Sequence, residues 1–113
     1  MQKRAAILLF GMILLNAALH AHPPSAIKLS LDPNTHLLQV TVMHDTQKPK
    51  EHFIKTIQIQ INGKDAVKQV FSSQTDAQKR AATYLLEDVK AGDQISASGE
   101  CNMYGKKTEI LKF

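Results

Sequence analysis

The chain has one cysteine, Cys101, among its 113 residues, and this scarcity excludes an internal disulfide. It also lacks any run of like charges beyond the N-terminus, which argues against binding to nucleic acid or to a membrane surface. Neither a glycine-rich phosphate loop nor a Gly-x-Ser-x-Gly sequence occurs, so nothing indicates a nucleotide-binding or nucleophile-elbow enzyme. The residues left to carry chemistry are the histidines and the lone thiol.

The N-terminus has the features of a secretory signal peptide. Lys3 and Arg4 precede an apolar run at residues 5–19, and the small residue Ala21 follows at a position suited to signal-peptidase cleavage. The apolar run is shorter than the roughly 20 residues that a membrane-spanning helix needs. We therefore expect residues 1–21 to be removed, leaving residues 22–113 as a periplasmic or secreted domain that is not bound to a membrane.

The expected mature chain is a single small domain. Removing residues 1–21 leaves 92 of the 113 residues, enough for one domain with a modest core. Lys3 and Arg4 are lost, so 12 of the 14 basic residues remain against 10 acidic ones, and the net charge falls from +4 to +2. An unpaired cysteine in an exported protein requires an explanation other than cross-linking.

Period-two alternation of apolar and polar residues dominates this domain. The clearest case is residues 57–61, where isoleucine and glutamine alternate before Asn62 and Gly63, a pair preferred in tight hairpin turns. Residues 75–86 are ambiguous, and we interpret them as a loop or one helical turn followed by a strand. The pattern predicts an all-β sandwich of seven strands, with strands at 26–31, 37–42, 57–61, 66–71, 82–86, 94–98 and 108–113.

Two histidines and the cysteine stand where they can face one centre. His44 follows the second predicted strand and His52 precedes the third, so they lie at the two ends of one polar loop, and Cys101 lies at the end of another strand. A thiolate beside two imidazoles can bind iron, copper or zinc. Spacing alone leaves the ordinary alternative open, in which loop histidines are solvated and a lone buried cysteine serves as a small hydrophobe.

The residues around this trio resemble the superoxide reductase (desulfoferrodoxin/neelaredoxin) family. The resemblance is carried by three short stretches: His22-Pro23-Pro24, then His44 with His52-Phe53-Ile54, and Cys101-Asn102 followed by Gly105. It implies an immunoglobulin-like sandwich that holds a non-haem iron, with His22, His44, His52 and Cys101 as ligands. It also implies reduction of superoxide to hydrogen peroxide with electrons from a donor protein.

The chain departs from the family pattern at one ligand. Tyr104 stands where the family has its fourth imidazole, and a set of four ligands suits copper or zinc as well as iron. Cleavage after Ala21 would make His22 the first residue, whose α-amino group and imidazole could bind copper together, similar to a histidine brace. Lys48 and Lys50, between His44 and His52, would attract the superoxide anion.

A second, looser resemblance leads to a different class of function. Residues 52–59, 62–64 and 90–93 are similar to the small sandwich subunit of the periplasmic thiosulfate-oxidation carrier complex. That resemblance implies a metal-free module that binds another exported protein. His44, His52 and Cys101 would then be packing residues.

Overall fold

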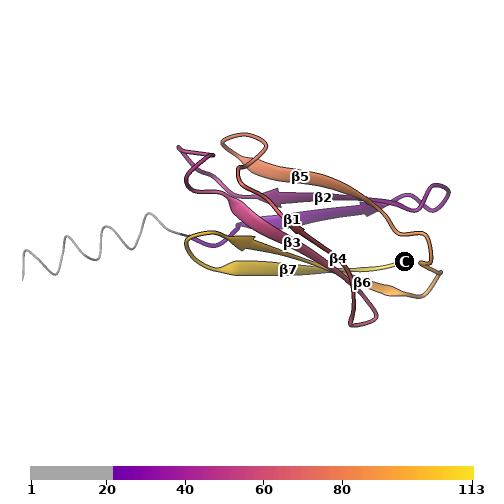
Figure 1. Ribbon diagram of the computed structural model, residues 1–113. Helices are drawn as coiled ribbons and strands as arrows, with labels where there is room; N and C mark the ends of the chain where they lie inside the picture. The colour runs from indigo at the N-terminus through magenta and orange to yellow at the C-terminus, as the bar shows by residue number, and fades with distance from the viewer. Residues whose placement is uncertain (1–21) are drawn as a thin grey trace, which may run out of the picture.

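The computed structural model describes residues 22–113, which form two packed antiparallel β-sheets (Figure 1). The expected signal peptide, residues 1–21, lies outside the described residues. One sheet has the strand order β1-β2-β5 and the other β4-β3-β6-β7. The strands are β1 (Ala26–Leu31), β2 (Leu37–Met43), β3 (Ile54–Ile61), β4 (Lys64–Val70), β5 (Lys79–Leu85), β6 (Gln94–Cys101) and β7 (Lys106–Lys112).

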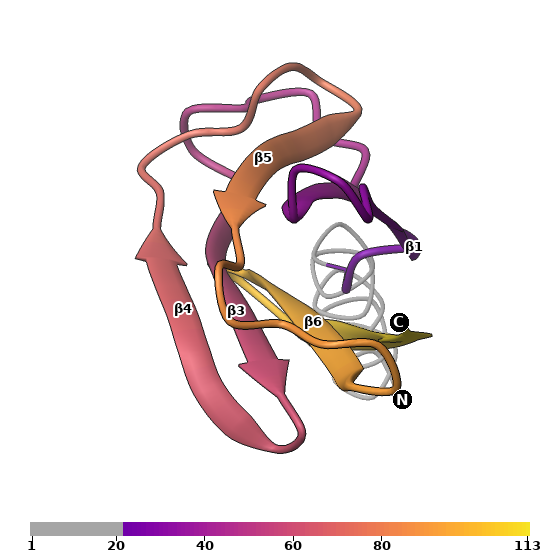
Figure 2. The ribbon, with the colours of Figure 1, turned by 90° about the vertical axis from the view of Figure 1, so that its right-hand side faces the viewer.

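This arrangement confirms the predicted seven-stranded, immunoglobulin-like sandwich. The fourth strand pairs with the third, in the four-stranded sheet, rather than with the fifth as in constant-type immunoglobulin domains. Figure 2 looks along the sandwich and shows the two layers, with β5 and β1 in one and β4, β3 and β6 in the other. Within residues 22–113, no helix is long and apolar enough to cross a membrane.

The β3–β4 hairpin forms as its sequence predicts. Asn62 and Gly63 have φ values of 52° and 80°, and positive φ at both central residues is the property of the type I′ turn that suits the twist of a two-residue hairpin. The ambiguous segment before β5 is a loop, and the strand begins at Lys79, three residues before the predicted start.

The core lies between the sheets and is almost entirely aliphatic. Each fully buried aliphatic side chain stabilises the fold by about 1.5–3 kcal/mol. Tyr84 of β5 also crosses the gap, donating its hydroxyl hydrogen to Gln69 Oε1 of β4 at 2.7 Å. The apolar side chains with at most 1% exposure are Leu38, Val40 and Val42 on β2, Ile54, Ile57 and Ile59 on β3, and Ile95 and Ala97 on β6.

Gly99 permits the close approach of β6 to β2. A Cβ at this position would lie 2.8 Å from Cγ1 and 3.0 Å from Cγ2 of the fully buried Val42. Because the packed core gives Val42 no space to move into, we expect Gly99→Ala to lower the free energy of unfolding by about 1–3 kcal/mol in urea titrations. Val42→Ala in the same chain should recover part of the loss. Additive losses in the double variant would contradict a direct clash.

Three loops meet at one end of the sandwich, on the left in Figure 1. The loop after β2 is bonded to the loop before β5, through His44 N–H to Gln78 O at 2.9 Å and Thr46 N–H to Ala77 O at 2.8 Å. The turn after β6 is bonded to the segment before β3, through Asn102 N–H to Phe53 O at 3.0 Å. The candidate ligands lie at this end.

Candidate metal centre

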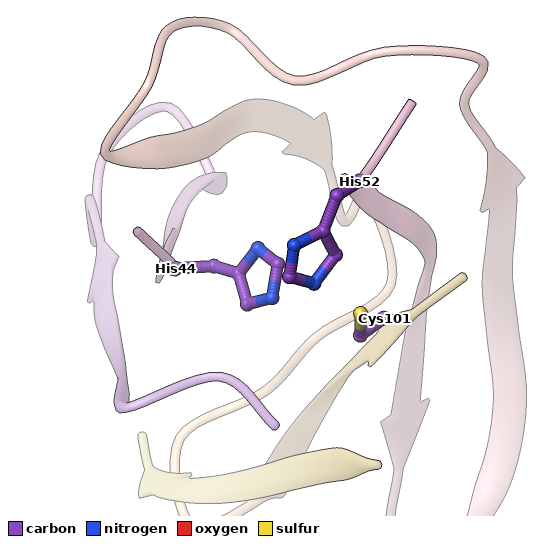
Figure 3. Close-up of side chains that lie close together, drawn as sticks. All are labelled: His44, His52 and Cys101. Carbon is purple, nitrogen blue, oxygen red and sulfur yellow. The ribbon is translucent and has the colours of Figure 1, made fainter. Parts of the chain in front are cut away.

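His44, His52 and Cys101 form a cluster of three potential metal ligands. One donor atom from each lies within 4.8 Å of the other two, and Figure 3 shows the two rings and the sulfur gathered around a common centre. His44 and Cys101 are buried, with 1% and 5% exposure, and His52 is half-buried. The prediction that these three side chains can face a common point is confirmed.

Strand pairing explains why His52 and Cys101 are neighbours. Ile54 of β3 pairs with Cys101 of β6, so the residues just before Ile54 lie beside the thiol. Asn102 fixes this arrangement, because its Oδ1 accepts the Phe53 N–H at 2.9 Å and its Nδ2 donates to Glu51 O at 2.9 Å. The Met103 N–H donates to Cys101 Sγ at 3.4 Å and holds the sulfur against the turn.

His52 carries the clearest sign of an unmet binding requirement. Its Nε2 is buried and has no hydrogen-bond partner among residues 22–113. Leaving a buried polar atom unpaired costs about 1–3 kcal/mol, so such atoms occur chiefly where something else binds them. Desolvation lowers the pKa of His52 below its ordinary value of 6.5, and the neighbouring His44 and His22 lower it further. His52 is therefore neutral at pH 7, as a metal ligand must be.

The lowered pKa of His52 predicts that the metal-free protein loses stability in acid. Below pH 6.5 the unfolded chain takes up a proton at His52 that the folded chain resists, so stability falls as the pH drops from 6.5 through the folded-state pKa. Above pH 6.5, His52 contributes nothing to the dependence of stability on pH. Urea titrations at about pH 7.5 and about pH 5 measure the effect. His52→Asn should flatten the dependence and His36→Asn should not; an unchanged slope in His52→Asn would contradict the assignment.

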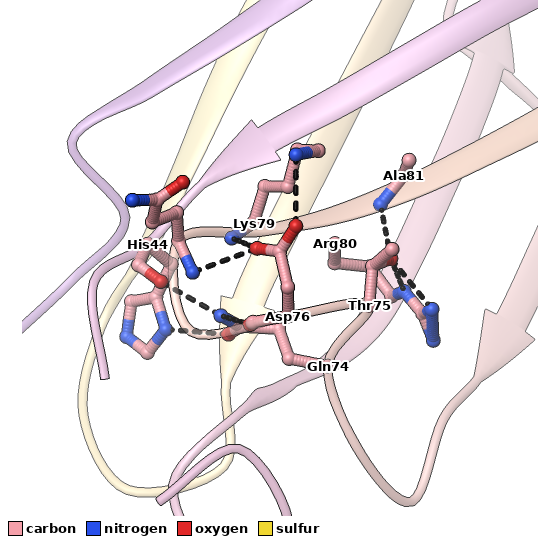
Figure 4. A network of polar contacts seen from close by, with 8 residues as sticks. His44, Gln74, Thr75, Asp76, Lys79, Arg80 and Ala81 are labelled. Atoms are coloured by element: carbon pink, nitrogen blue, oxygen red, sulfur yellow. Dashed lines mark hydrogen bonds and ion pairs between the residues drawn. The ribbon is translucent and has the colours of Figure 1, made fainter. Parts of the chain in front are cut away.

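His44 lies between two oxygen atoms. Its Nδ1 is 2.7 Å from Oε1 of the buried Gln74, and its Nε2 is 3.2 Å from the carbonyl oxygen of His22 (Figure 4 shows the Gln74 side). A neutral imidazole has one N–H, so it can donate to only one of the two oxygens. The other ring nitrogen offers a lone pair, the form in which histidine binds metals.

His22, the fourth predicted ligand, lies beside this cluster rather than within it. Its ring centroid is 4.8 Å from that of His44 and 5.4 Å from that of His52, and its Nδ1 is 3.1 Å from Pro23 O. Pro23 packs on the turn after β6, where a Cβ on Gly105 would lie 2.6 Å from Pro23 Cβ. Gly105, with φ of 80°, thereby gives the segment carrying His22 the space to cross the end of the sandwich.

An open pocket of about 730 Å³ adjoins the cluster. His22 and His52 line it together with Met103, so small solutes can reach the two imidazoles. Of the two lysines expected to attract an anion, Lys48 lines the pocket but pairs with Glu51 at 3.5 Å, and Lys50 is outside the lining. Asp45 and Glu51 also line it. The mouth therefore has mixed charge, and the expected steering by lysine is weakened.

The donor set fits a transition metal that accepts nitrogen and sulfur. Two donor atoms that each bind one tetrahedral ion at about 2.0–2.3 Å lie roughly 3.5 Å apart. The donor atoms of the three residues lie at most 4.8 Å apart, so small side-chain rotations would bring them to that spacing. Two imidazoles and a thiolate suit iron, copper or zinc and disfavour calcium or magnesium, which prefer oxygen. Tyr104 is 62% exposed and is not among the pocket-lining residues.

Comparison of the chain with protein-family models, with curated proteins and with solved structures gives no match. The assignment therefore rests on the residues themselves. Sequence reasoning missed Gln74, the buried partner of His44, because one glutamine in a polar loop resembles any other. The Asn102 contacts could have been anticipated only from its position next to Cys101.

Proposed function

We propose that this protein is an exported metalloprotein, periplasmic or secreted, with a non-haem iron centre of the superoxide reductase type. The observation that carries the proposal is the buried Nε2 of His52, which has no hydrogen-bond partner within the described part of the chain and lies beside a second imidazole and a thiol. Burying a polar atom without a hydrogen-bond partner costs free energy, and a bound metal ion would remove that cost. His44, His52 and Cys101 would hold the ion.

Each residue has a distinct part in such a centre. Cys101 contributes a thiolate, the type of ligand that pushes electron density onto iron. His44 and His52 contribute neutral nitrogens, and the pocket beside His52 admits a small molecule. Bound ferrous iron would supply one electron to superoxide, which with two protons gives hydrogen peroxide, and an electron-donor protein would then restore the ferrous state.

His22 supports a second candidate, a copper or zinc site. Its ring lies within 5.4 Å of both other imidazoles, measured between centroids, so a modest movement would add it as a fourth ligand. Four nitrogen and sulfur ligands are typical of zinc, and copper accepts the same set. An N-terminus at His22 would strengthen the copper alternative by adding the α-amino group.

The test starts from the full-length chain, exported and purified, with the mature N-terminus determined by mass spectrometry. The metal-free protein is loaded under anaerobic conditions with Fe²⁺, Cu⁺ or Zn²⁺ in separate samples. We expect one tightly bound iron per chain, a visible thiolate-to-iron absorption after oxidation, and removal of superoxide that consumes reductant and releases no oxygen.

Two matched histidine variants control the test. His52→Asn removes a proposed ligand, whereas His36→Asn changes a histidine near Phe113, away from the cluster. Asparagine also tolerates the positive φ of 60° at residue 36. Equal metal content in the two variants would overturn the site. Absence of stoichiometric metal from every sample would favour the metal-free partner-binding module instead.

A further inference from the structure

Among residues 22–113, Gln74 is the one buried polar side chain that is hydrogen-bonded to a proposed ligand without being a ligand itself. It is 6% exposed and lies in the loop before β5, thirty residues from His44 in sequence. Figure 4 shows its amide beside the His44 ring, in a network that continues to Asp76. The position of its amide relative to the ring decides which nitrogen of His44 can bind a metal.

The orientation of the Gln74 amide is fixed by three backbone groups. Its Oε1 accepts the N–H of Ile54 at 3.0 Å, and its Nε2 donates to the carbonyl oxygens of His44 at 2.7 Å and Asp76 at 3.1 Å. A backbone N–H only donates and a carbonyl only accepts. If the amide were turned over, its NH₂ group would face the Ile54 N–H, and its oxygen would face the carbonyl oxygens of His44 and Asp76. Only the observed orientation therefore satisfies all three hydrogen bonds.

This orientation determines the tautomer of His44. Because Oε1 is an acceptor, Nδ1 of His44, 2.7 Å away, must carry the hydrogen and donate it. In the neutral ring the lone pair is then on Nε2. That atom faces the His22 carbonyl oxygen at 3.2 Å, and two facing lone pairs are satisfied only by a proton or a cation.

We propose that Gln74 is a positioning residue that locks His44 in the Nδ1–H tautomer and so presents Nε2 to the metal. The inference rests on the proposed function. Histidine ligands generally donate their second nitrogen to a carboxylate or carbonyl, and losing that partner typically lowers metal affinity about 10–100-fold. Gln74 is anchored to the backbone of both β3 and the His44 segment, so it also fixes the ring orientation.

The first measurement uses the metal-free wild-type protein and does not depend on any metal. Long-range ¹H–¹⁵N NMR spectra distinguish the two neutral imidazole tautomers. We expect His44 to be an Nδ1–H tautomer in the wild type and in Gln74→Glu, which keeps an acceptor oxygen. Gln74→Leu should shift His44 towards a mixture that includes Nε2–H. An Nε2–H tautomer in the wild type would overturn the proposal.

The second measurement is the affinity for Zn²⁺, determined by chelator competition. Gln74→Leu should bind about 10–100-fold more weakly than the wild type, and Gln74→Glu should recover most of the loss. Gln78→Leu makes the same change at an exposed glutamine of the same loop and should bind like the wild type. Wild-type affinity in Gln74→Leu would overturn the proposal, whereas absence of Zn²⁺ binding in the wild type would count against the proposed function alone.

If Gln74→Leu does not fold, because the Ile54 N–H and the His44 carbonyl lose their partner, the wild-type tautomer still decides the question. Gln74→Glu keeps an acceptor for the Ile54 N–H but has no donor for the His44 carbonyl, so it adds to the wild-type result only where it folds. Glutamate that binds Zn²⁺ tightly with His44 in the Nδ1–H form would support a positioning role. The proposal would be contradicted by a Gln74→Glu variant that folds and keeps the Nδ1–H tautomer of His44 but binds Zn²⁺ as weakly as we expect of Gln74→Leu.

Discussion

Cys101→Ser should abolish stoichiometric iron binding and remove the visible absorption that a thiolate gives to the oxidised centre. Loss of a partner that merely supports a ligand costs about 10–100-fold in affinity, so we expect loss of a direct thiolate ligand to exceed about 100-fold. Serine has nearly the same shape, and its neutral hydroxyl is a poor ligand for the metals that accept thiolate. Metal analysis after gel filtration and the visible spectrum together measure the effect.

The stability of the metal-free Cys101→Ser variant distinguishes loss of metal binding from misfolding. Cys101 is buried at 5% exposure, so its replacement also places a hydroxyl in the core. We expect the metal-free Cys101→Ser variant to unfold cooperatively in urea, about 1–2 kcal/mol less stable than the metal-free wild type. A folded variant that keeps both the metal and the visible absorption would exclude Cys101 as a ligand.

Metal binding should greatly stabilise the folded domain. A ligand that binds only the native state stabilises it by about 4 kcal/mol when present at a thousand times its dissociation constant. For a domain of this size, that corresponds to an increase in Tm on the order of 15–30 °C. The three proposed ligands come from the end of β2, the segment before β3 and the end of β6, so the ion would tie both sheets together.

Calorimetry with and without Zn²⁺ or Fe²⁺ measures this stabilisation. His36→Asn should show the full increase in Tm, because His36 contacts Glu87 O and Phe113 rather than the cluster. His52→Asn should show little of it. An increase that is the same in both variants would indicate metal binding elsewhere on the chain.

Alternation in the sequence was enough to predict all seven strands, and the differences lie at the ends of the strands. The start of β3 was predicted at residue 57, but the strand begins at Ile54, because a register shift between Ile54 and Thr56 breaks the period-two pattern. β5 begins at Lys79 because pairing with Met43 of β2 outweighs the helical tendency of that segment.

The cluster was predictable because strand ends that meet at one edge bring their flanking residues together. His44 and His52 flank one loop, and the pairing of Ile54 with Cys101 places the thiol beside them. Gln74 was not predictable, because its role depends on which loop folds over His44. Nor was the contact between Gly105 and Pro23, which involves no pattern that a single sequence displays.

The chain's single thiol makes covalent labelling a direct report on the centre. Cys101 is the sole cysteine in the sequence and is 5% exposed, so an alkylating reagent should modify the folded metal-free protein slowly and the unfolded chain quickly. A bound ion would block the sulfur further. The rate of alkylation, followed by mass spectrometry of whole-cell extracts and compared with the rate for the metal-free protein, would then report on the occupancy of the site, without purification and without competing thiols on the same chain.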